Sequence, residues 1–307
     1  MRTFRLHQFG GSDQLAVEAV ERPVPQAGEL LVQVREIGVN PVDWKIREGY
    51  LRDRVQLPLT PGQDFAGEVA ACGPQAPTGS KFRPGAQVFG FARGAYSEYA
   101  IAAIHAIALI PEGLSFESAA ALPTPGLTAD QILTRAAVRA GQRVLIHGAA
   151  GSVGSIAVQL AKLAGAYVIG TVLGDGREYV TRLGADRVID AAVDKGYEGV
   201  GEPVDTVIDL VGGATQQHSW KLVRNGGILV SSVGLNDDLA EAEKRGVRAV
   251  AFTMKHEAAG LDRLGQLAAD GELLLRIAKV LPFRQAPDAQ DLVQNGHPHG
   301  KVLLRVA

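Results

Sequence analysis

The chain has 307 residues, of which 46% are hydrophobic and 21% are charged, so it is neither disordered nor too short for two folded domains. Its formal net charge of −2 provides no basic field for nucleic acid or for anionic lipid. The single cysteine, Cys72, excludes an internal disulfide and a cysteine zinc cluster, and we expect it to be an inert small hydrophobic residue.

The first residues, MRTFRLHQFGG, lack the continuous apolar segment of a signal peptide. The longest apolar run, residues 99–110, contains His105 and is too short to span a bilayer. We therefore expect a cytoplasmic protein with no membrane partner.

Short strand-like segments fill the first 120 residues. ELLVQVREIGV (29–39), FAGEVAACG (65–73) and GAYSEYAIA (94–102) are separated by turn-forming PVPQAGE, TPGQD and RPGAQ. This pattern predicts a β-rich, partly barrel-like domain over residues 1–123.

From residue 124 onward, short apolar runs alternate with helix-length segments. The runs are RVLIH (143–147), YVIGT (167–171), RVID (187–190), DTVID (205–209), ILVSS (228–232) and VRAVAF (247–252). This alternation predicts an α/β fold, a Rossmann-type doubly wound parallel sheet over residues 124–265. The tail from 266 to 307 ends in strand-like GKVLLRVA, which we expect to return to the first domain.

A glycine turn follows the first of these runs directly. The segment after it places apolar side chains such as Ile156 and Leu160 on one helical face, which predicts a helix packed on the sheet. Glycines at a strand–helix turn let the backbone approach a pyrophosphate, whose charge binds the free amides at the helix start. We predict that a dinucleotide is held by the backbone of Gly148, Ala150, Gly151, Ser152, Val153 and Gly154.

The end of the next strand indicates which dinucleotide binds. An acidic residue there would bind a free ribose 2′-hydroxyl, but this chain has Thr171 followed by VLGDGR. A hydroxyl tolerates a 2′-phosphate and Arg177 can pair with it, so we predict NADPH. Asp175 in the same loop argues for NADH, and Arg177 as a solvated residue at a helix start is the alternative.

Seven segments carry a family resemblance that runs from residue 38 to the C-terminus. They are GVNPVDWKIREG, PGQDFAGEV, GAYSEYA, LPTPGLTA, HGAAGSVGSIAVQLAKLAGAYVIGT, VIDLVGG and HPHGKVLLRV. Together they resemble the zinc-free, quinone-oxidoreductase-like branch of the medium-chain dehydrogenase/reductase superfamily. The resemblance implies a GroES-like, partly open barrel domain beside the Rossmann domain, NADPH as cofactor, and a homodimer.

The resemblance also implies the absence of zinc. Zinc alcohol dehydrogenases of that superfamily carry a cysteine where this chain has Asn40, and a histidine–glutamate pair at Gln63 and Asp64. Amides are poor zinc ligands, and we interpret HPH at 297–299 as a surface loop rather than a chelating pair. Without a Lewis acid, hydride transfer needs an electrophilic acceptor, either a quinone or an α,β-unsaturated carbonyl.

The resemblance assigns further site residues. The nicotinamide half of the cofactor is expected along Val211, Ser232, Val233 and Gly234. Asn40 is expected to reach the nicotinamide ribose or the substrate, with a local turn role before Pro41 as the equal alternative. Thr128 is expected near the carboxamide, with helix packing as the alternative; the stretch before it, with Thr124 and Pro125, departs from the family pattern.

Tyr50 lies in the loop REGYLRD, where its phenol could donate to a developing oxyanion. The alternatives are that it is only a pocket wall and that water supplies the proton. We expect Asp43 and Lys45 to form a structural ion pair or a solvated face, and Lys301 to be exposed.

The sequence is compatible with two other functions. Reduction of an enoyl thioester would require a basic groove for a carrier phosphate, which nothing in the sequence marks. A non-enzymatic NADPH-binding sensor, scaffold or RNA binder is the second alternative, and the net negative charge argues against RNA.

Overall fold

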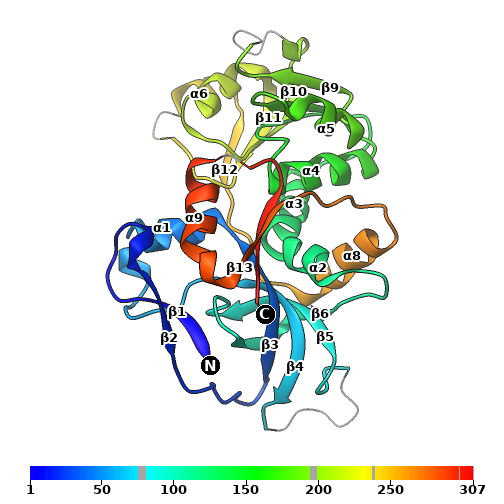
Figure 1. Ribbon diagram of the computed structural model, residues 1–307. Helices are drawn as coiled ribbons and strands as arrows, with labels where there is room; N and C mark the ends of the chain where they lie inside the picture. The colour runs from blue at the N-terminus through cyan, green and yellow to red at the C-terminus, as the bar shows by residue number, and fades with distance from the viewer. Residues whose placement is uncertain (75–80, 194–198, 237–238, 297, 307) are drawn as a thin grey trace. The chain divides into compact units, whose positions relative to one another are not determined.

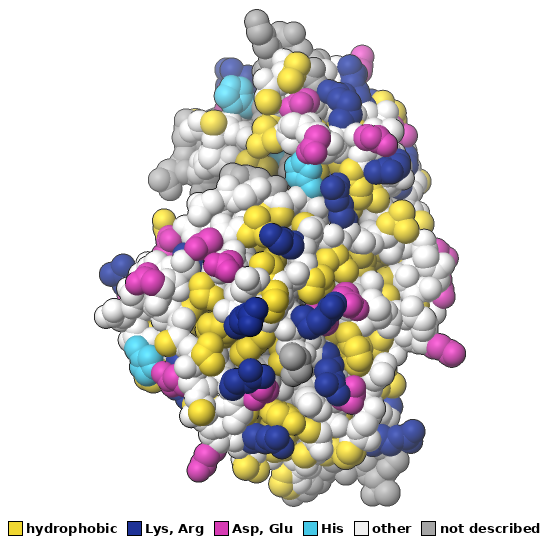
Figure 2. Space-filling view, in the orientation of Figure 1, with side chains coloured by type: hydrophobic (Ala, Val, Ile, Leu, Met, Phe, Trp, Pro, Cys, Tyr) yellow, Lys and Arg dark blue, Asp and Glu magenta, His cyan; other side chains and the backbone are white. Residues whose placement is uncertain are grey.

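The chain divides into two units. Unit 1 comprises Met1–Thr124 and His256–Ala307, and unit 2 comprises Pro125–Lys255 (Figure 1). The computed structural model describes residues 1–74, 81–193, 199–236, 239–296 and 298–306. Figure 2 shows basic and acidic side chains interspersed over one face of the molecule, in line with the small net charge.

Unit 1 is built on β-strands. They are β1 (Arg2–Leu6), β2 (Leu15–Ala19), β3 (Glu29–Val39), β4 (Asp64–Cys72), β5 (Gln87–Arg93), β6 (Tyr99–Leu109), β13 (Ile277–Pro282) and β14 (Lys301–Arg305). The main sheet has the order β13-β14-β3-β4-β5-β6, and β3 also pairs with β6. This second pairing closes β3, β4, β5 and β6 into a barrel, while β1 and β2 form a separate antiparallel ribbon. The predicted GroES-like, partly open barrel is confirmed.

Helices join and cover these strands. They are α1 (Pro41–Arg47), α2 (Phe116–Ala121), α8 (Ala258–Ala269) and α9 (Ala286–Asn295), with 3-10 turns at Ser12–Gln14, Arg52–Arg54 and Phe283–Gln285. The C-terminal strand β14 pairs antiparallel with β3, with Val302 opposite Val39. The tail therefore returns to the first domain, as its strand-like pattern predicts.

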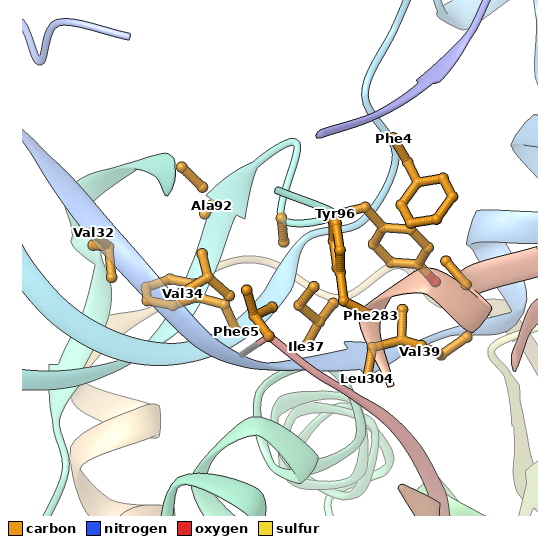
Figure 3. Close-up of a cluster of buried hydrophobic side chains, with 14 of the residues drawn as sticks. Phe4, Val32, Val34, Ile37, Val39, Phe65, Ala92, Tyr96, Phe283 and Leu304 are labelled. Atoms are coloured by element: carbon orange, nitrogen blue, oxygen red, sulfur yellow. The ribbon is translucent and has the colours of Figure 1, made fainter. Parts of the chain in front are cut away.

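The core of unit 1 lies around β3. Figure 3 shows side chains from several elements gathered there, including Phe4 from β1, Ile37 from β3, Phe65 from β4 and Leu304 from β14. Phe4 meets the ring of Phe283 edge to face at a centroid distance of 5.0 Å. Burial of these apolar groups holds together strands that are far apart in the sequence.

Unit 2 is a parallel sheet with helices between its strands. Its strands are β7 (Arg143–Ile146), β8 (Tyr167–Val172), β9 (Arg187–Asp190), β10 (Val204–Asp209), β11 (Val223–Ser231) and β12 (Arg248–Ala251). Its helices are α4 (Ser152–Leu163), α5 (Gly176–Arg182), α6 (Gly213–Leu222) and α7 (Ala240–Lys244), and α3 (Pro123–Ala136) contains the boundary between the units.

The strand order in unit 2 is β12-β11-β10-β7-β8-β9, and all neighbours are parallel. From β7 the chain passes through α4 to β8 and β9 on one side, and then reaches β10 on the other side of β7. The order therefore reverses between β7 and β10, which is where doubly wound sheets bind ligands. The predicted Rossmann-type sheet is confirmed.

Helix α4 is buried over most of its circumference from Gly154 to Ala161, which exceeds the one-sided face expected from the sequence. The apolar run at 99–110 forms strand β6 rather than a helix. Among the described residues, no helix combines the length and apolar character needed to cross a membrane.

Candidate active site

The glycine turn of unit 2 lies between β7 and α4. Gly148 has a φ of +71°, a conformation that residues with a side chain rarely adopt. A Cβ on Gly154 would lie 2.1 Å from the carbonyl oxygen of Gly148 and 2.7 Å from the Cα of Ala149. At Gly151 the nearest atom to a Cβ is the same oxygen, at 3.3 Å. Glycine at 154 therefore lets the helix start directly against the turn.

The first amides of α4 are oriented to bind an anion. The helix has 12 residues, and Gly151 caps it without a side-chain hydrogen bond, so the N–H groups of Ser152, Val153 and Gly154 have no acceptor within the helix. The amide of Gly151 itself donates to the carbonyl of Gly148 at 3.0 Å and is used inside the turn. A pyrophosphate fits this cradle, since backbone donors and the positive end of the helix dipole meet there.

The end of β8 presents no acidic side chain. Thr171 is buried, and its hydroxyl shares a 3.0 Å hydrogen bond with Nδ1 of His147, whose Nε2 contacts the Ser219 hydroxyl at 2.8 Å. Burial lowers the pKa of His147 to about 4, although the charge of Asp209 acts in the opposite direction. The Thr171 hydroxyl thus lies in the interior of unit 2, and His147, directly after β7, links it to Ser219 on α6.

Arg177 lies in the first turn of α5, after the exposed N-cap residue Asp175. Its side chain is exposed, and one guanidinium N–H donates to the carbonyl oxygen of Val188 on β9. The guanidinium is therefore anchored on Val188, the second residue of β9, which pairs with Gly170 of β8. Thr171 on β8 and Arg177 on α5 lie on either side of the same connection, but Thr171 is buried and Arg177 is exposed.

The residues predicted along the nicotinamide lie in two neighbouring loops, after β10 and after β11. Val211 is 52% exposed and Val233 is 45% exposed, which is unusual for valine. Ser232 donates its amide hydrogen to the carbonyl of Asp209 at 3.1 Å, and Gly234 accepts from the side chain of Gln216 at 2.8 Å. The structure therefore brings Val211, Ser232, Val233 and Gly234 together at the carboxyl edge of the sheet.

Two residues that were not predicted from the sequence hold these loops in place. The buried carboxylate of Asp209 accepts from the amides of Val211 at 3.0 Å and Gly212 at 2.8 Å, and from Nε2 of Gln216 at 2.7 Å. Aspartate at a strand end commonly binds the amides two and three residues ahead, so VIDLVGG contained a signal for this turn. Nothing local in the sequence identifies Gln216 as the link between the loops.

In unit 1, Asn40 is buried at the junction of β3 and α1, where it is the N-cap residue before Pro41. Its backbone N–H donates to Oδ2 of Asp43 at 2.8 Å, and the hydroxyl of Tyr96 donates to the same oxygen at 3.1 Å. Burial, aided by the charge of Asp64, raises the pKa of Asp43 to about 7, although Lys301 and the two hydrogen bonds act in the opposite direction.

The expected pair of Asp43 with Lys45 is wrong. Asp43 is only 2% exposed and binds Asn40 and Tyr96, whereas the Lys45 ammonium lies 5.7 Å from the ring centroid of Trp44. The reason is helical geometry, since residues two apart on a helix do not face each other.

The expected exposure of Lys301 is also wrong. Its side chain is 3% exposed, and its Nζ donates to Oδ1 of Asn40 at 2.5 Å and to Oδ2 of Asp64 at 3.0 Å. Pairing of β14 with β3 brings Lys301 beside Asn40. Gly38 leaves room for the lysine stem, because a Cβ at position 38 would lie 2.8 Å from Cε of Lys301.

These residues do not fit a zinc ion. Asp64 binds the Lys301 ammonium and accepts from the amide of Thr124 at 3.2 Å and from its hydroxyl at 2.5 Å, while Gln63 donates to that hydroxyl at 3.0 Å. An ammonium repels a metal cation, and amides bind zinc poorly. Within the described ranges, no group of three or more His, Cys, Asp or Glu side chains is placed to hold a metal. The HPH segment lies partly outside them, at His297.

The two remaining candidates differ in exposure. Tyr50 is 70% exposed, contacts Trp44 edge to face at 5.8 Å, and helps to line a surface hollow of about 440 Å³ with Glu48 and Arg52. Thr128 lies on α3 in unit 2 and is buried.

Comparison with known proteins gives consistent matches along the chain. The model of the alcohol dehydrogenase GroES-like domain matches residues 26–112, and that of the zinc-binding dehydrogenase family matches residues 183–304. A quinone oxidoreductase from Sus scrofa is 34% identical over 99% of this chain and 97% of its own length.

Solved structures give the same picture. The quinone oxidoreductase from Coxiella burnetii has a TM-score of 0.91 and 32% identity, covering 100% of this chain and 99% of the other. The Escherichia coli quinone oxidoreductase, solved as a complex with NADPH, has a TM-score of 0.91 and 27% identity, covering 100% of both chains.

Proposed function

The chain belongs to the quinone-oxidoreductase-like branch of the medium-chain dehydrogenase/reductase superfamily, and from this premise we propose that it is an NADPH-dependent oxidoreductase. Its acceptor is a quinone or the activated double bond of an α,β-unsaturated carbonyl. The observation that carries the proposal is the cradle at the start of α4, where Gly154 allows contact with the turn and the amides of Ser152, Val153 and Gly154 have no helical acceptor.

The residues of unit 2 bind and orient the cofactor. The start of α4 would bind the pyrophosphate, and Arg177 in the first turn of α5 would pair with the 2′-phosphate that distinguishes NADPH from NADH. Val211 and Val233 offer exposed apolar surface to the nicotinamide, in loops held by Asp209 and Gln216. Thr128 contributes a hydroxyl near the carboxamide. When bound, the dihydronicotinamide supplies the hydride.

The side chains of unit 1 that stand at the zinc-ligand positions of related dehydrogenases indicate which acceptors can react. Asn40, Gln63 and Asp64 surround Lys301 and Thr124 rather than forming a zinc site, so no Lewis acid polarises the acceptor. A quinone or an enone is electrophilic without one. A bound NADPH would supply one hydride and Tyr50 or water would supply one proton, which together convert the acceptor to a hydroquinone or a saturated ketone and leave NADP⁺.

The test is single-turnover oxidation of bound NADPH, followed at the nicotinamide absorbance band. We would offer 9,10-phenanthrenequinone and an alkyl vinyl ketone in parallel, with NADH as the cofactor control and a zinc chelator added in a further run. The expected result is rapid oxidation with NADPH, slow oxidation with NADH, and no effect of the chelator. Binding of NADPH without oxidation by either acceptor would favour a sensor or scaffold, and chelator inhibition would contradict the zinc-independent reaction.

A further inference from the structure

We propose that Lys301 is a positioning residue that fixes the orientation of the Asn40 side-chain amide, so that its NH2 group donates to the oxygen of the bound acceptor. The inference rests on the proposed function and deepens it. It assigns a role to a buried lysine that the cofactor and the proton donor leave unused.

The hydrogen-bond chemistry of lysine determines which way the amide faces. An ammonium only donates, so the Asn40 atom 2.5 Å from Nζ must be the carbonyl oxygen, Oδ1. An amide flipped by 180° would place its NH2 hydrogens against the ammonium. Lys301 therefore selects one of two orientations that asparagine otherwise adopts with nearly the same shape.

The other end of the amide is left with poor partners. Nδ2 of Asn40 lies 3.4 Å from the carbonyl oxygen of Gly38 and 3.5 Å from the hydroxyl oxygen of Thr124, both at the long limit of a hydrogen bond. The Thr124 hydroxyl donates to Asp64 at 2.5 Å and accepts from Gln63 at 3.0 Å. A buried NH2 group with only marginal acceptors is ready to donate to a ligand oxygen.

The ammonium is itself held from several sides. Asp64 neutralises its charge at 3.0 Å and is fixed by the amide and hydroxyl of Thr124. A Cβ at Gly38 would lie 2.6 Å from the carbonyl oxygen of Ala120, 2.8 Å from Cε of Lys301 and 2.9 Å from Cβ of Asp64, so this packing leaves no room for a side chain. The orientation of Asn40 is thus set by β3, β4 and β14 together.

The donor matters because of where charge develops. When the cofactor's hydride adds to the acceptor, an electron pair moves onto the acceptor's carbonyl oxygen, and a proton later neutralises it. A preorganised N–H donor stabilises that oxygen more in the transition state than in the ground state. A flipped Asn40 would instead present its own carbonyl lone pairs to a negative oxygen.

The experiment is a double-mutant cycle on single-turnover NADPH oxidation with 9,10-phenanthrenequinone, using Lys301→Met, Asn40→Ala and the double variant. We expect Lys301→Met to slow hydride transfer by about tenfold or more, with the NADPH dissociation constant unchanged within about twofold. In the Asn40→Ala background, Lys301→Met should cause little further loss, because its effect passes through Asn40. Lys162→Met, which removes a lysine paired with Asp186 at 2.7 Å in unit 2, is the matched control and should keep the wild-type rate.

Asn40→Asp keeps an oxygen toward Lys301 but replaces the NH2 donor with a second oxygen. Because this variant retains the buried Lys301–Asp64 ion pair, it tests the proposal even if Lys301→Met fails to fold. We expect it to slow hydride transfer at least as much as Asn40→Ala. Wild-type rates in either Lys301→Met or Asn40→Asp, or additive losses in the cycle, would overturn the positioning role while leaving the proposed function intact. A wild-type protein that oxidises no NADPH with any acceptor would refute the function and this inference with it.

Discussion

The carboxyl group of Asp43 gives the sharpest stability prediction. Asp43 accepts hydrogen bonds from the backbone N–H of Asn40 and from the Tyr96 hydroxyl, and burial raises its pKa from 3.8 to about 7. Between these two values Asp43 is protonated in the folded protein and ionised in the unfolded chain. Asp43→Asn is the matched perturbation, since asparagine keeps an acceptor oxygen and resembles the protonated acid.

The sign follows from proton binding. In that range the folded state binds the extra proton, so this group contributes stability that is fully present below pH 3.8 and is lost as the pH rises through about 7. At about 1.4 kcal/mol per pH unit, the difference between the two pKa values corresponds to about 4 kcal/mol. Asp43→Asn has no carboxyl group to ionise, so it does not lose this stability as the pH rises. The unfolding free energy of the variant minus that of the wild type should therefore increase by up to about 4 kcal/mol between pH 4 and pH 8.

The assay is urea unfolding at a series of pH values, followed by tryptophan fluorescence. The chain has two tryptophans, Trp44 in unit 1 and Trp220 in unit 2, so a Trp220→Phe background reports the unit that contains Asp43. Asp53→Asn, at an exposed carboxylate, is the control and should run parallel to wild type. Parallel pH profiles for Asp43→Asn and wild type would refute the assignment of a buried, protonated Asp43.

Three further predictions concern ligand binding and turnover. Gly154→Ala should weaken NADPH binding at least about 100-fold or prevent folding, because its Cβ would lie 2.1 Å from the Gly148 carbonyl oxygen. Gly151→Ala is the control and should change the NADPH dissociation constant only a few-fold. Equal effects of the two substitutions in a fluorescence titration would argue against pyrophosphate binding at the start of α4. Arg177→Ala should weaken NADPH about tenfold and leave NADH unchanged, and an equal loss for both would remove its role at the 2′-phosphate. Tyr50→Phe should slow single turnover about tenfold or more without changing the thermal midpoint, since the ring is 70% exposed; an unchanged rate would assign the proton to water.

The architecture was predictable because it follows from short-range periodicity. The segment 29–39 forms β3 and the segment 187–190 forms β9 with the predicted bounds. In unit 2, apolar runs separated by helix-length segments leave few alternatives to a parallel sheet. Strand β11 starts at Val223, earlier than the predicted 228, because Val223 pairs with Val204 across a register shift that the apolar run at 228–232 does not reveal.

The buried polar clusters were not predictable in the same way. Lys301 carries a charge at the start of a strand, and local rules assign such a residue to the surface. Its burial depends on β14 pairing with β3, on Gly38 lacking a side chain, and on Asp64 supplying the opposite charge. These three conditions arise from segments far apart in the sequence and coincide only in the folded chain. The cross-link by Gln216 escapes local reasoning for the same reason.

The energetics of the Lys301–Asp64 pair indicate what it does. Removing a lysine and a carboxylate from water costs several kcal/mol each, and replacing such a pair by apolar residues is often neutral or stabilising, so a buried ion pair is a weak contribution to stability. The pair instead determines the orientation of the Asn40 side-chain amide, because the ammonium binds the amide oxygen and leaves the NH2 group as the donor. A Lys301→Met, Asp64→Asn double variant, which leaves no buried charge unpaired, should therefore unfold at nearly the wild-type urea concentration yet transfer hydride as slowly as Lys301→Met. Recovery of the rate along with stability would show that unit 1 needs the pair only for folding.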